Sequence, residues 1–457
     1  MSVPSVDRGQ WSGKLGFIFA AAGSAIGLGN IWRFPYTAGE SGGGAFVLIY
    51  LIFVLVIGLP VMLSELAIGR SAERSAVGAF KKIVPGSAWP ILGGLGVLTG
   101  FGILAFYSVV AGWTLSYFFK AVTGELSGID AEQSGAILTN LISDPVWAPA
   151  LAAVFLLLTI LVVRGGVSAG IERVTKVLMP LLLLLLIALA IRSMTLPGAG
   201  AGIDYLFKPD FSKLSPGVIM AALGQALFSL SLGMGAMITY GSYLPKSENM
   251  AVAGTSVAFF DTFIAILAGL IIFPAMFATG GEPTAGPGLV FVVLPTIFDA
   301  MPAGNICAIA FYALLAIAAL TSTISLLEVI VAYFVDEKGW SRDKAAWVLG
   351  FVCFLLAVPS ALANGAVAAF GPNGLFGAWD FLTLNNNVWG NYSLSIGAIL
   401  TCVFVGWKWG IPKALESLEA SGHKMPLAGA WSVLVRFVCP VVVFVLLIYI
   451  VVTGTYF

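Results

Sequence analysis

The sequence predicts an all-α polytopic membrane protein, and two observations support that prediction. Hydrophobic residues make up 59% of the 457 residues, whereas charged residues make up only 10%. A soluble chain of this length needs more charge to cover its surface, so the composition indicates a bundle of membrane helices. The second observation is a series of apolar segments of about 20 residues or more, which is the length that crosses a bilayer as a helix.

Eleven apolar segments predict eleven spans within a single transmembrane domain over residues 1–457. They run over residues 13–36, 44–70, 91–120, 147–164, 171–193, 217–243, 250–279, 303–334, 343–363, 377–408 and 429–453. We expect residues 13–193 to form a first five-helix repeat, residues 217–408 a second, and residues 429–453 an extra helix. Most of the 22 Lys and Arg residues fall on the side of the N-terminus. This asymmetry predicts a cytoplasmic N-terminus and, with eleven spans, an extracytoplasmic C-terminus.

Several classes of protein are excluded by composition. The net charge is zero and no long basic block occurs, so nucleic acid is not an expected partner. The four Cys residues are widely spaced and the single His423 lies in a polar loop, which argues against disulfides and zinc. No His or Cys stands beside a base in a catalytic pattern, so we do not expect an enzyme.

The first span is interrupted at its centre. Residues 23–36 read GSAIGLGNIWRFPY, which places Gly27, Gly29 and Asn30 at bilayer depth. Glycines loosen a helix, and any backbone group released in lipid must find a partner inside the protein. The pattern therefore predicts a broken helix that lines a cavity. The alternative is that the glycines only permit close helix packing.

The sixth span shows the same interruption. Residues 228–235 read FSLSLGMG between an apolar beginning and a helical end. Two interrupted helices, each opening a set of five spans, predict an inverted-repeat transporter with its site near the bilayer midplane. An interrupted helix presents free N–H groups that suit a carboxylate and free carbonyls that suit a hard cation.

Polar residues in three other spans add to this pattern. Asp261 lies in a nearly uncharged span, where an unpaired carboxylate costs at least about 2.5–3.5 kcal/mol, so it should face a cation or a donor. The eighth span gathers four hydroxyl groups, which belong to Thr321, Ser322, Thr323 and Ser325. The alternatives are that Asp261 caps a neighbouring helix and that the hydroxyls bond back to their own helix. Glu65 and Glu328 are interpreted as structural hydrogen-bond hubs.

Three segments outside the helix pattern carry their own expectations. The outer connections 194–216 and 281–302 contain Gly, Pro and a few charges and should be folded, and the second should pack over the bundle as a lid. Residues 384–392, LNNNVWGNY, interrupt the tenth span, and we interpret them as a loop or an unwound entry to that span.

Several motifs together resemble one family. These are Trp11, GSAIGLGNIWRFPY at 23–36, GGGAF at 42–46, GLPVMLSELAIGR at 58–70, FSLSLGMGAMITYGSY at 228–243 and ALTS at 319–322. They resemble the neurotransmitter:sodium symporter family, in particular its eleven-span bacterial amino-acid transporters of the leucine-transporter (LeuT) fold. The resemblance runs from about residue 8 to residue 450. It implies a five-plus-five inverted repeat with the first and sixth helices unwound, sodium-coupled amino-acid symport, a bacterial inner-membrane location and no organic cofactor.

The resemblance further implies two sodium sites. The first would use the carbonyl of Ala25 and the side chains of Asn30, Ser229 and Asp261, completed by the carboxylate of the substrate. The second would use the carbonyls of Gly23, Ile26 and Ala318 and the hydroxyls of Thr321 and Ser322. Oxygen-only ligand sets of this kind suit a hard cation.

A substrate site follows from the same resemblance. Its residues would be Ala25, Leu28, Gly29, Ile103, Tyr107, Phe228, Ser229, Ser231, Met234, Ser322 and Leu326. Monoamine transporters of the family carry an acid where this chain has Gly27, which favours an α-amino acid that brings its own carboxylate. The apolar side chains of the set favour a large hydrophobic or aromatic one, such as Leu, Phe, Tyr or Trp.

Gates on both sides of that site are implied as well. Arg33 and Asp380 would pair above the site, with Tyr107 and Phe228 as a thin lid. On the inner side, Arg8 and Asp336 would pair, with Trp11 and Tyr243 nearby. Gly170 and Pro180 would let the fifth span unwind so that water reaches the second sodium.

The resemblance also bears on chloride. This chain has Ala265 where relatives carry a Ser or a Glu, and Asp261 where many carry a neutral Asn. A fixed negative charge beside the first sodium can replace the anion, so we expect chloride independence. The rival interpretation is a substrate-binding sensor or a channel on the same scaffold. A channel needs a continuous polar path and a sensor usually carries a further soluble domain, and the sequence indicates neither.

Overall fold

The computed structural model describes residues 9–283 and 286–456 and is almost entirely helical. In the first half of the chain the helices are α1 (Lys14–Ala25), η1 (Gly29–Arg33), α2 (Phe34–Glu40), α3 (Gly44–Phe53), η2 (Val54–Gly58), α4 (Leu59–Ala72), α5 (Ala76–Ile83), α6 (Pro90–Thr123), α7 (Ala131–Ser143), α8 (Trp147–Val163), η3 (Val167–Glu172), α9 (Arg173–Met194), α10 (Gly200–Phe207) and η4 (Phe211–Lys213).

The second half continues in the same way. Its helices are α11 (Pro216–Ser229), α12 (Ala236–Gly241), α13 (Met250–Ala278), η5 (Gly286–Leu289), α14 (Val293–Asp299), α15 (Gly304–Lys338), α16 (Arg342–Ala361), α17 (Phe381–Asn385), η6 (Asn386–Ser393), α18 (Leu394–Val403), η7 (Phe404–Gly410), α19 (Ile411–Leu418), α20 (Ala428–Val433), η8 (Leu434–Val438) and α21 (Cys439–Thr453). In the described residues only two isolated β-bridges accompany the helices.

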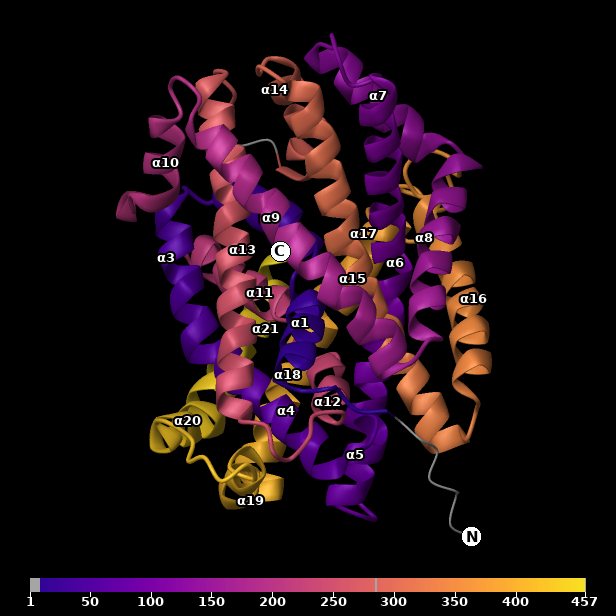
Figure 1. The fold of residues 1–457 in the computed structure, drawn as a ribbon, viewed down its shortest axis with the longest axis vertical. Coiled ribbons are helices and arrows are strands. Elements are labelled where there is room, and N and C mark those ends of the chain that lie inside the picture. Colours follow the sequence, from indigo (N-terminus) through magenta and orange to yellow (C-terminus); the bar gives the residue numbers. More distant parts are fainter. Residues whose placement is uncertain (1–8, 284–285, 457) are drawn as a thin grey trace.

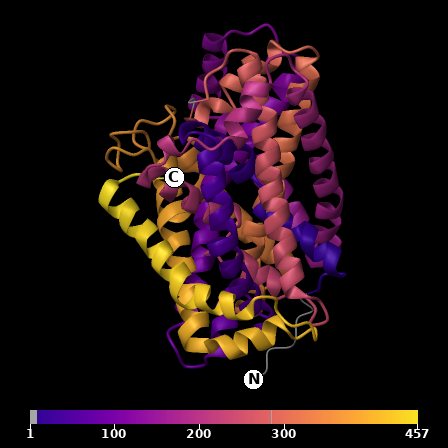
Figure 2. The ribbon, with the colours of Figure 1, turned by 90° about the vertical axis from the view of Figure 1, so that its left-hand side faces the viewer.

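The helices form one elongated bundle (Figure 1). Helices α7, α10 and α14 lie at one end, which we call the outer end, and α5, α19 and α20 lie at the other, which we call the inner end, following the predicted orientation. Helices α1, α11 and α15 lie between them in the middle of the bundle. Figure 2 shows α20 and α21 lying along one side of the molecule, outside the other helices.

The observed helices agree with the predicted spans. Eight helices in the described part of the chain are long and apolar enough to cross a membrane, or up to ten if each of two bent helix pairs is counted as one. The predicted sixth span falls on α11 and α12, which are too short to cross singly. The structure is therefore compatible with eleven spans, and it places breaks in the two spans where the sequence predicts them.

The interpretation of residues 384–392 as a loop or an unwound entry is wrong. These residues lie within a continuous helix, Phe381–Leu418, and η6 gives that helix wide π-turns. Asparagine favours turns because its side chain competes for backbone groups. Here the side chains form hydrogen bonds within the helix, because Asn391 Nδ2 donates to the carbonyl of Asn386 (3.4 Å) and Trp389 Nε1 donates to Asn385 Oδ1 (3.1 Å).

The outer connections are folded, as expected. The first contains α10 and η4, and the second contains η5 and α14. The second connection packs back onto the bundle through Phe291, whose carbonyl accepts a hydrogen bond from the hydroxyl of Tyr117 (2.7 Å). The Phe291 ring also packs edge-on against Trp32 of the first span and Trp113 of the third span. It therefore bridges the outer parts of these two spans.

Candidate functional site

The break in the first span lies between α1 and η1, and the two halves are bent by 52°. Ile26 has extended backbone angles there, which end α1. Gly27 lies against the eighth and third spans: a Cβ atom on it would come within 2.3 Å of Ser322 Oγ and 2.5 Å of the Tyr107 hydroxyl. Because Gly27 has no side chain, the hydroxyls of Ser322 and Tyr107 can approach the backbone of the broken helix. Polar contacts at the break favour the predicted lined cavity over simple helix packing.

The break in the sixth span covers the residues between α11 and α12. Ser231, Gly233 and Gly235 all have positive φ angles there, of 54°, 80° and 75°. A positive φ angle is sterically unfavourable for any residue that carries a Cβ atom, so contacts with the surrounding residues must hold Ser231 in this conformation. Its hydroxyl donates to the carbonyl of Ser24 (3.0 Å), which ties the two breaks together.

Two buried polar side chains satisfy backbone groups that the breaks release. Glu65 Oε1 accepts the N–H of Gly233 (2.7 Å), and Gln225 Nε2 donates to the carbonyl of Gly29 (2.7 Å). Both side chains are fully buried, where an unpaired polar backbone group is costly. Glu65 thus has the hydrogen-bond role expected for it, whereas the sequence pattern did not single out Gln225 for such a role.

Asp261 lies at the centre of a buried polar cluster. Asn30 Nδ2 donates to Asp261 Oδ1 (2.7 Å), the Ser229 hydroxyl lies 2.8 Å from Oδ2, and the Tyr50 hydroxyl donates to Oδ2 (3.3 Å). Hydrogen bonds to a charged group contribute about 1.5–3 kcal/mol each, enough together to offset the cost of placing a carboxylate at this depth. The three side chains of the expected first sodium site are therefore in contact, and the hydrogen-bond cluster around Asp261 also contains Tyr50, which sequence reasoning missed.

The groups of the expected second sodium site also converge. The Thr321 hydroxyl lies 3.4 Å from the carbonyl oxygen of Ile26 and 3.0 Å from that of Ala318. The Ser322 hydroxyl lies 3.3 Å from the same Ile26 oxygen. Gly23 is close as well, because a Cβ atom on it would lie 3.2 Å from Thr321 Cβ. The hydroxyls of Thr321 and Ser322 on α15 thus lie within hydrogen-bond distance of the Ile26 carbonyl, which directly follows α1.

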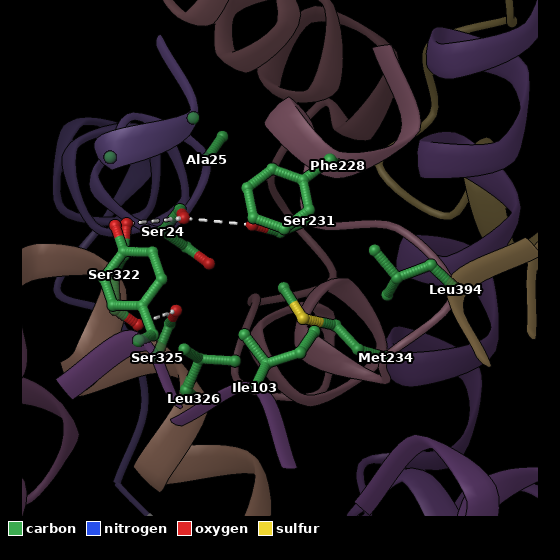
Figure 3. A pocket seen from close by; sticks show the side chains of 13 residues that line it. Ser24, Ala25, Ile103, Phe228, Ser231, Met234, Ser322, Ser325, Leu326 and Leu394 are labelled. Carbon is green, nitrogen blue, oxygen red and sulfur yellow. Dashed lines mark hydrogen bonds between the residues drawn. The ribbon is translucent and has the colours of Figure 1, made fainter. Parts of the chain in front are cut away.

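A cavity of about 30 Å³ lies between the two breaks (Figure 3). It is lined by nine of the predicted substrate residues, namely Ala25, Gly29, Ile103, Tyr107, Phe228, Ser231, Met234, Ser322 and Leu326. Two predicted residues do not line it: the Leu28 N–H donates to the Tyr107 hydroxyl (2.8 Å), and Ser229 belongs to the Asp261 cluster.

The cavity also has lining residues that the predicted set did not contain. These are Ser24, Gly27, Ser325 and Leu394. Ser24 lies in the motif of the first span and Ser325 in the hydroxyl cluster of the eighth, so both carried a sequence signal. Leu394 carried none, because it is one apolar residue in an apolar helix. The Ser24 hydroxyl is buried and has no hydrogen-bond partner among the described residues.

A larger vestibule of about 680 Å³ lies on the outer side of the cavity. Phe228 and Tyr107 line both spaces, so they lie between them, where the thin lid was expected. Arg33 lies in the vestibule with its guanidinium carbon 4.3 Å from the centre of the Phe228 ring, a cation–π contact.

The expected pair of Arg33 and Asp380 is not formed in this structure. Within the described residues the Arg33 side chain has no ion-pair partner. Asp380 instead caps α17, where it accepts hydrogen bonds from the N–H (2.9 Å) and the hydroxyl (2.6 Å) of Thr383. The carboxylate is engaged by its own helix because Asp380 occupies the N-cap position.

The inner side is closed by aromatic packing and an ion pair. Trp11 Nε1 donates to the carbonyl of Tyr240 (3.0 Å), and its ring packs edge-on against Tyr243. The Tyr243 hydroxyl donates to the buried Glu328 (2.6 Å), which also pairs with Arg342 (2.6 Å).

Asp336 and Arg8 were the expected inner pair. Asp336 accepts a hydrogen bond from the N–H of Ser75 (2.6 Å), whereas Arg8 lies outside the described residues. An inner pocket of about 230 Å³ is lined by Tyr243, Asp336 and Arg342. In the described part of the chain it shares no lining residue with the central cavity, so the inner barrier is thicker than the outer one.

A second inner contact joins the first and fifth spans. Glu172, at the end of η3, accepts hydrogen bonds from the N–H (2.9 Å) and the hydroxyl of Ser12, and pairs with Lys176 (2.5 Å). Gly170 lies in the π-turns of η3, which begin the fifth span at its inner end, and Pro180 lies inside α9. This contact was not anticipated from the sequence.

A broken-helix bundle with a central cavity and converging oxygen groups defines a class of membrane transport protein, and comparisons with known proteins agree. The model of the sodium:neurotransmitter symporter family matches residues 8–135 and 138–456. An uncharacterized sodium-dependent transporter of Bacillus subtilis, YhdH, is 42% identical over 437 residues, which cover 95% of this chain and 96% of that protein. One from Haemophilus influenzae is 38% identical and covers 98% of this chain and 99% of its own.

A solved structure shows the same fold. The crystal structure of MhsT in complex with L-phenylalanine superposes with a TM-score of 0.88 at 47% identity, covering 96% of this chain and 99% of that one. The chain belongs to the sodium:neurotransmitter symporter family. It is a multi-pass membrane protein with the LeuT fold and a sodium-coupled symporter rather than an enzyme, which confirms those predictions from the sequence.

Proposed function

We propose that the protein couples sodium entry to the uptake of large hydrophobic and aromatic L-α-amino acids by alternating access, and that it needs no chloride. The observation that carries this proposal is the central cavity, where the released backbone of two broken helices meets an apolar wall. A zwitterion with an apolar side chain fits a cavity of this kind, with its charged groups at the polar backbone and its side chain at the apolar wall. The relative MhsT, crystallised with L-phenylalanine, supports the same substrate class.

The polar end of the cavity suits the amino and carboxyl groups of the substrate. Gly27 leaves no space for an acidic side chain, so the chain offers no fixed partner to an amine that lacks a carboxylate. The unpartnered Ser24 hydroxyl and the Tyr107 hydroxyl both line the cavity and can bond to the substrate's polar groups. The N–H groups released at the break attract a carboxylate through the positive end of the helix dipole.

The apolar end suits a large side chain. Ile103, Met234 and Leu326 line the cavity together with the ring of Phe228. Methionine is flexible and adapts to differently shaped ligands. The cavity of about 30 Å³ holds only about two waters by volume, so Met234 and its neighbours have to move to admit an aromatic side chain.

Two sodium ions would bind where the oxygen groups converge. We propose Ala25, Asn30, Ser229 and Asp261 for the first, with the substrate's carboxylate, and the groups around Thr321 and Ser322 for the second. Sharing one ion with the substrate makes amino-acid binding depend on sodium. Ala265 lies on α13 one turn beyond Asp261, and its buried side chain has no polar atom, so the charge next to the first ion comes from Asp261.

In alternating access, the thin outer barrier and the thicker inner barrier would open in turn. On the outer side, Phe228 and Tyr107 separate the cavity from the vestibule, and Arg33 and Asp380 would approach each other when the vestibule closes. On the inner side, the Trp11 and Tyr243 packing, the Glu328 ion pair and the Glu172 contact would separate. An ion pair becomes stronger as the space around it dries, so each gate gains strength as it closes.

The first experiment is a binding screen on the purified full-length protein. L-Phenylalanine, L-tryptophan, L-leucine, glycine and phenethylamine are each measured by thermal shift in sodium gluconate, sodium chloride and potassium gluconate. We expect the three large amino acids to stabilise the protein in both sodium salts and not in potassium. Stabilisation by phenethylamine but by none of the amino acids would overturn the proposed substrate class, and stabilisation only in sodium chloride would overturn chloride independence.

A further inference from the structure

We propose that Leu394, which the tenth span contributes, is a specificity-determining residue that sets the size of the substrate side chain the cavity accepts. The inference rests on the proposed function, since it concerns the substrate of the same cavity. It adds a wall residue from a span to which the sequence-based site assigned no substrate contact.

Leu394 is the first residue of α18 and is 2% exposed. Its side chain lines the cavity together with Met234 and Ile103. Figure 3 shows Leu394 on the Met234 side of the cavity, across from the hydroxyl of Ser322. It therefore faces the region that a substrate side chain would fill once its amino and carboxyl groups are held at the breaks.

The backbone of Leu394 is fixed by direct contact with the break in the sixth span. A Cβ atom on Gly233 would lie 2.2 Å from the Leu394 carbonyl oxygen, and one on Gly397 would lie 2.0 Å from the Gly233 carbonyl oxygen. The two main chains thus touch with no side chain between them. Because α18 is already in contact with the break, Leu394 can yield space to a ligand only by changing rotamer.

The preceding residue ties α18 to the third span. Ser393 Oγ lies 2.5 Å from Thr99 Oγ1, one turn before Ile103 on α6. Trp389 packs over Gly102, where a Cβ atom would lie 2.2 Å from its ring, and Gly102 is the neighbour of Ile103. These contacts fix the helix that contains Leu394 relative to α6, so Leu394 and Ile103 keep their relative positions in the cavity wall.

Residues 384–392, the Asn-rich segment of the tenth span, have a structural role at this wall. Its π-turns, Asn386–Ser393, end directly at Leu394. A π-turn adds a residue to the helix and turns the following side chains relative to an α-helix, and such segments are frequent at functional sites. The wide turns of η6 thus set the direction in which α18 presents its first side chain.

Size selectivity follows from this placement. In a close-packed apolar pocket, one methylene group changes discrimination between substrates by about 10–200-fold. Shortening Leu394 to Ala should favour the largest substrate, and enlarging it to Phe should favour smaller ones. We expect the ratio of L-leucine Kd to L-tryptophan Kd to rise about tenfold in Leu394→Ala and to fall about tenfold in Leu394→Phe.

The test measures that ratio on full-length protein in sodium gluconate by competition against radiolabelled L-phenylalanine. Leu394→Met, which nearly conserves volume, should leave the ratio within about twofold and shows that the site tolerates substitution. Leu400→Ala makes the same deletion six residues further along α18 at a partly buried position outside the cavity, and should leave the ratio unchanged.

The outcomes separate the two proposals. Opposite shifts in the Ala and Phe variants support the role of Leu394. Equal changes in affinity for all three amino acids, or a shift in Leu400→Ala as large as in Leu394→Ala, would overturn it while leaving the proposed function intact. If wild-type protein bound none of these amino acids in sodium, the proposed function itself would fail, and the inference with it.

Discussion

Asp261 brings a carboxylate to a point where Asn30, Ser229 and Tyr50 all direct hydrogen-bond donors. Such a cluster keeps a buried charge in place, and a cation that joins it removes the remaining cost of burial. The charge is what distinguishes this site from one built on a neutral amide, and it accounts for the proposed independence of chloride.

Replacing the charge tests this account. In Asp261→Asn, we expect the sodium concentration for half-maximal substrate binding to rise about tenfold in gluconate, equal to about 1.4 kcal/mol, because the ion loses an anionic ligand. Chloride should then restore part of the affinity. Asp343→Asn makes the same change at the inner surface, where Asp343 pairs with Arg164 (3.0 Å), and serves as the control. Unchanged sodium dependence in Asp261→Asn would contradict the assignment.

Gly27 provides a second test at the scale of single residues. Its φ is not positive, so alanine strains the site only through the lack of space beside Ser322 Oγ and the Tyr107 hydroxyl. Overpacking costs about 1–3 kcal/mol, so amino-acid affinity in Gly27→Ala should fall by about tenfold or more. Gly94 on α6 has open space around it, and Gly94→Ala should bind like wild type. Wild-type affinity in Gly27→Ala would show that the glycine is not needed for the site.

Side chains differ in how well the sequence predicts them. Asn30, Asp261 and Thr321 stand out because polar residues are rare at bilayer depth. Tyr50, Gln225 and Leu394 do not, because each lies in a helix whose composition is ordinary and becomes important only through the packing of another span against it. The pair of Arg33 and Asp380 could not be predicted for this structure, since it depends on how far the vestibule is closed.

At the scale of the elements, the two broken spans follow directly from their glycines, whereas the π-turns of η6 do not. Asn-rich segments usually end helices, but here the Asn385 and Asn391 side chains bond within the helix and the Trp389 ring packs onto Gly102. Such packing depends on the third span, which is about 290 residues distant in sequence. Local sequence patterns carry no information about it.

The inner contact between the first and fifth spans leads to a prediction for an element. Glu172 is 2% exposed and accepts a hydrogen bond from Ser12, which precedes the N-cap residue of α1. In Glu172→Gln the loss of charge weakens this contact, so the inner side should open more often and substrate affinity should fall severalfold. The reporter is Ala332→Cys, buried beside the inner pocket, whose labelling by a thiol reagent should speed up severalfold. The four native cysteines are buried and add little background.

The control for that experiment is Glu337→Gln. Glu337 forms an inner-surface pair with Lys81 (3.3 Å), and its loss should not change the labelling rate because Lys81 is largely exposed. If Glu172→Gln also left the rate unchanged, the contact would have no part in inner closure.

The whole molecule combines a thin outer barrier, a small cavity and a thicker inner barrier. The spans and their order could be predicted from hydropathy, since lipid demands long apolar helices. The relative thickness of the barriers could not, because it arises from which side chains of distant spans meet. This asymmetry suits a transporter, in which only one side opens at a time, better than a channel.

The most direct test of sodium-coupled uptake is the accumulation of radiolabelled L-phenylalanine in proteoliposomes with an inward sodium gradient and gluconate as the anion. We predict sodium-dependent accumulation above the external concentration, increased by an inside-negative potential, which contributes about 2.3 kcal/mol per charge for each 100 mV. Sodium-dependent binding without accumulation would indicate a sensor instead. Uptake that only equilibrates L-phenylalanine, whatever the sodium gradient, would indicate a channel, and either result would contradict the proposed function.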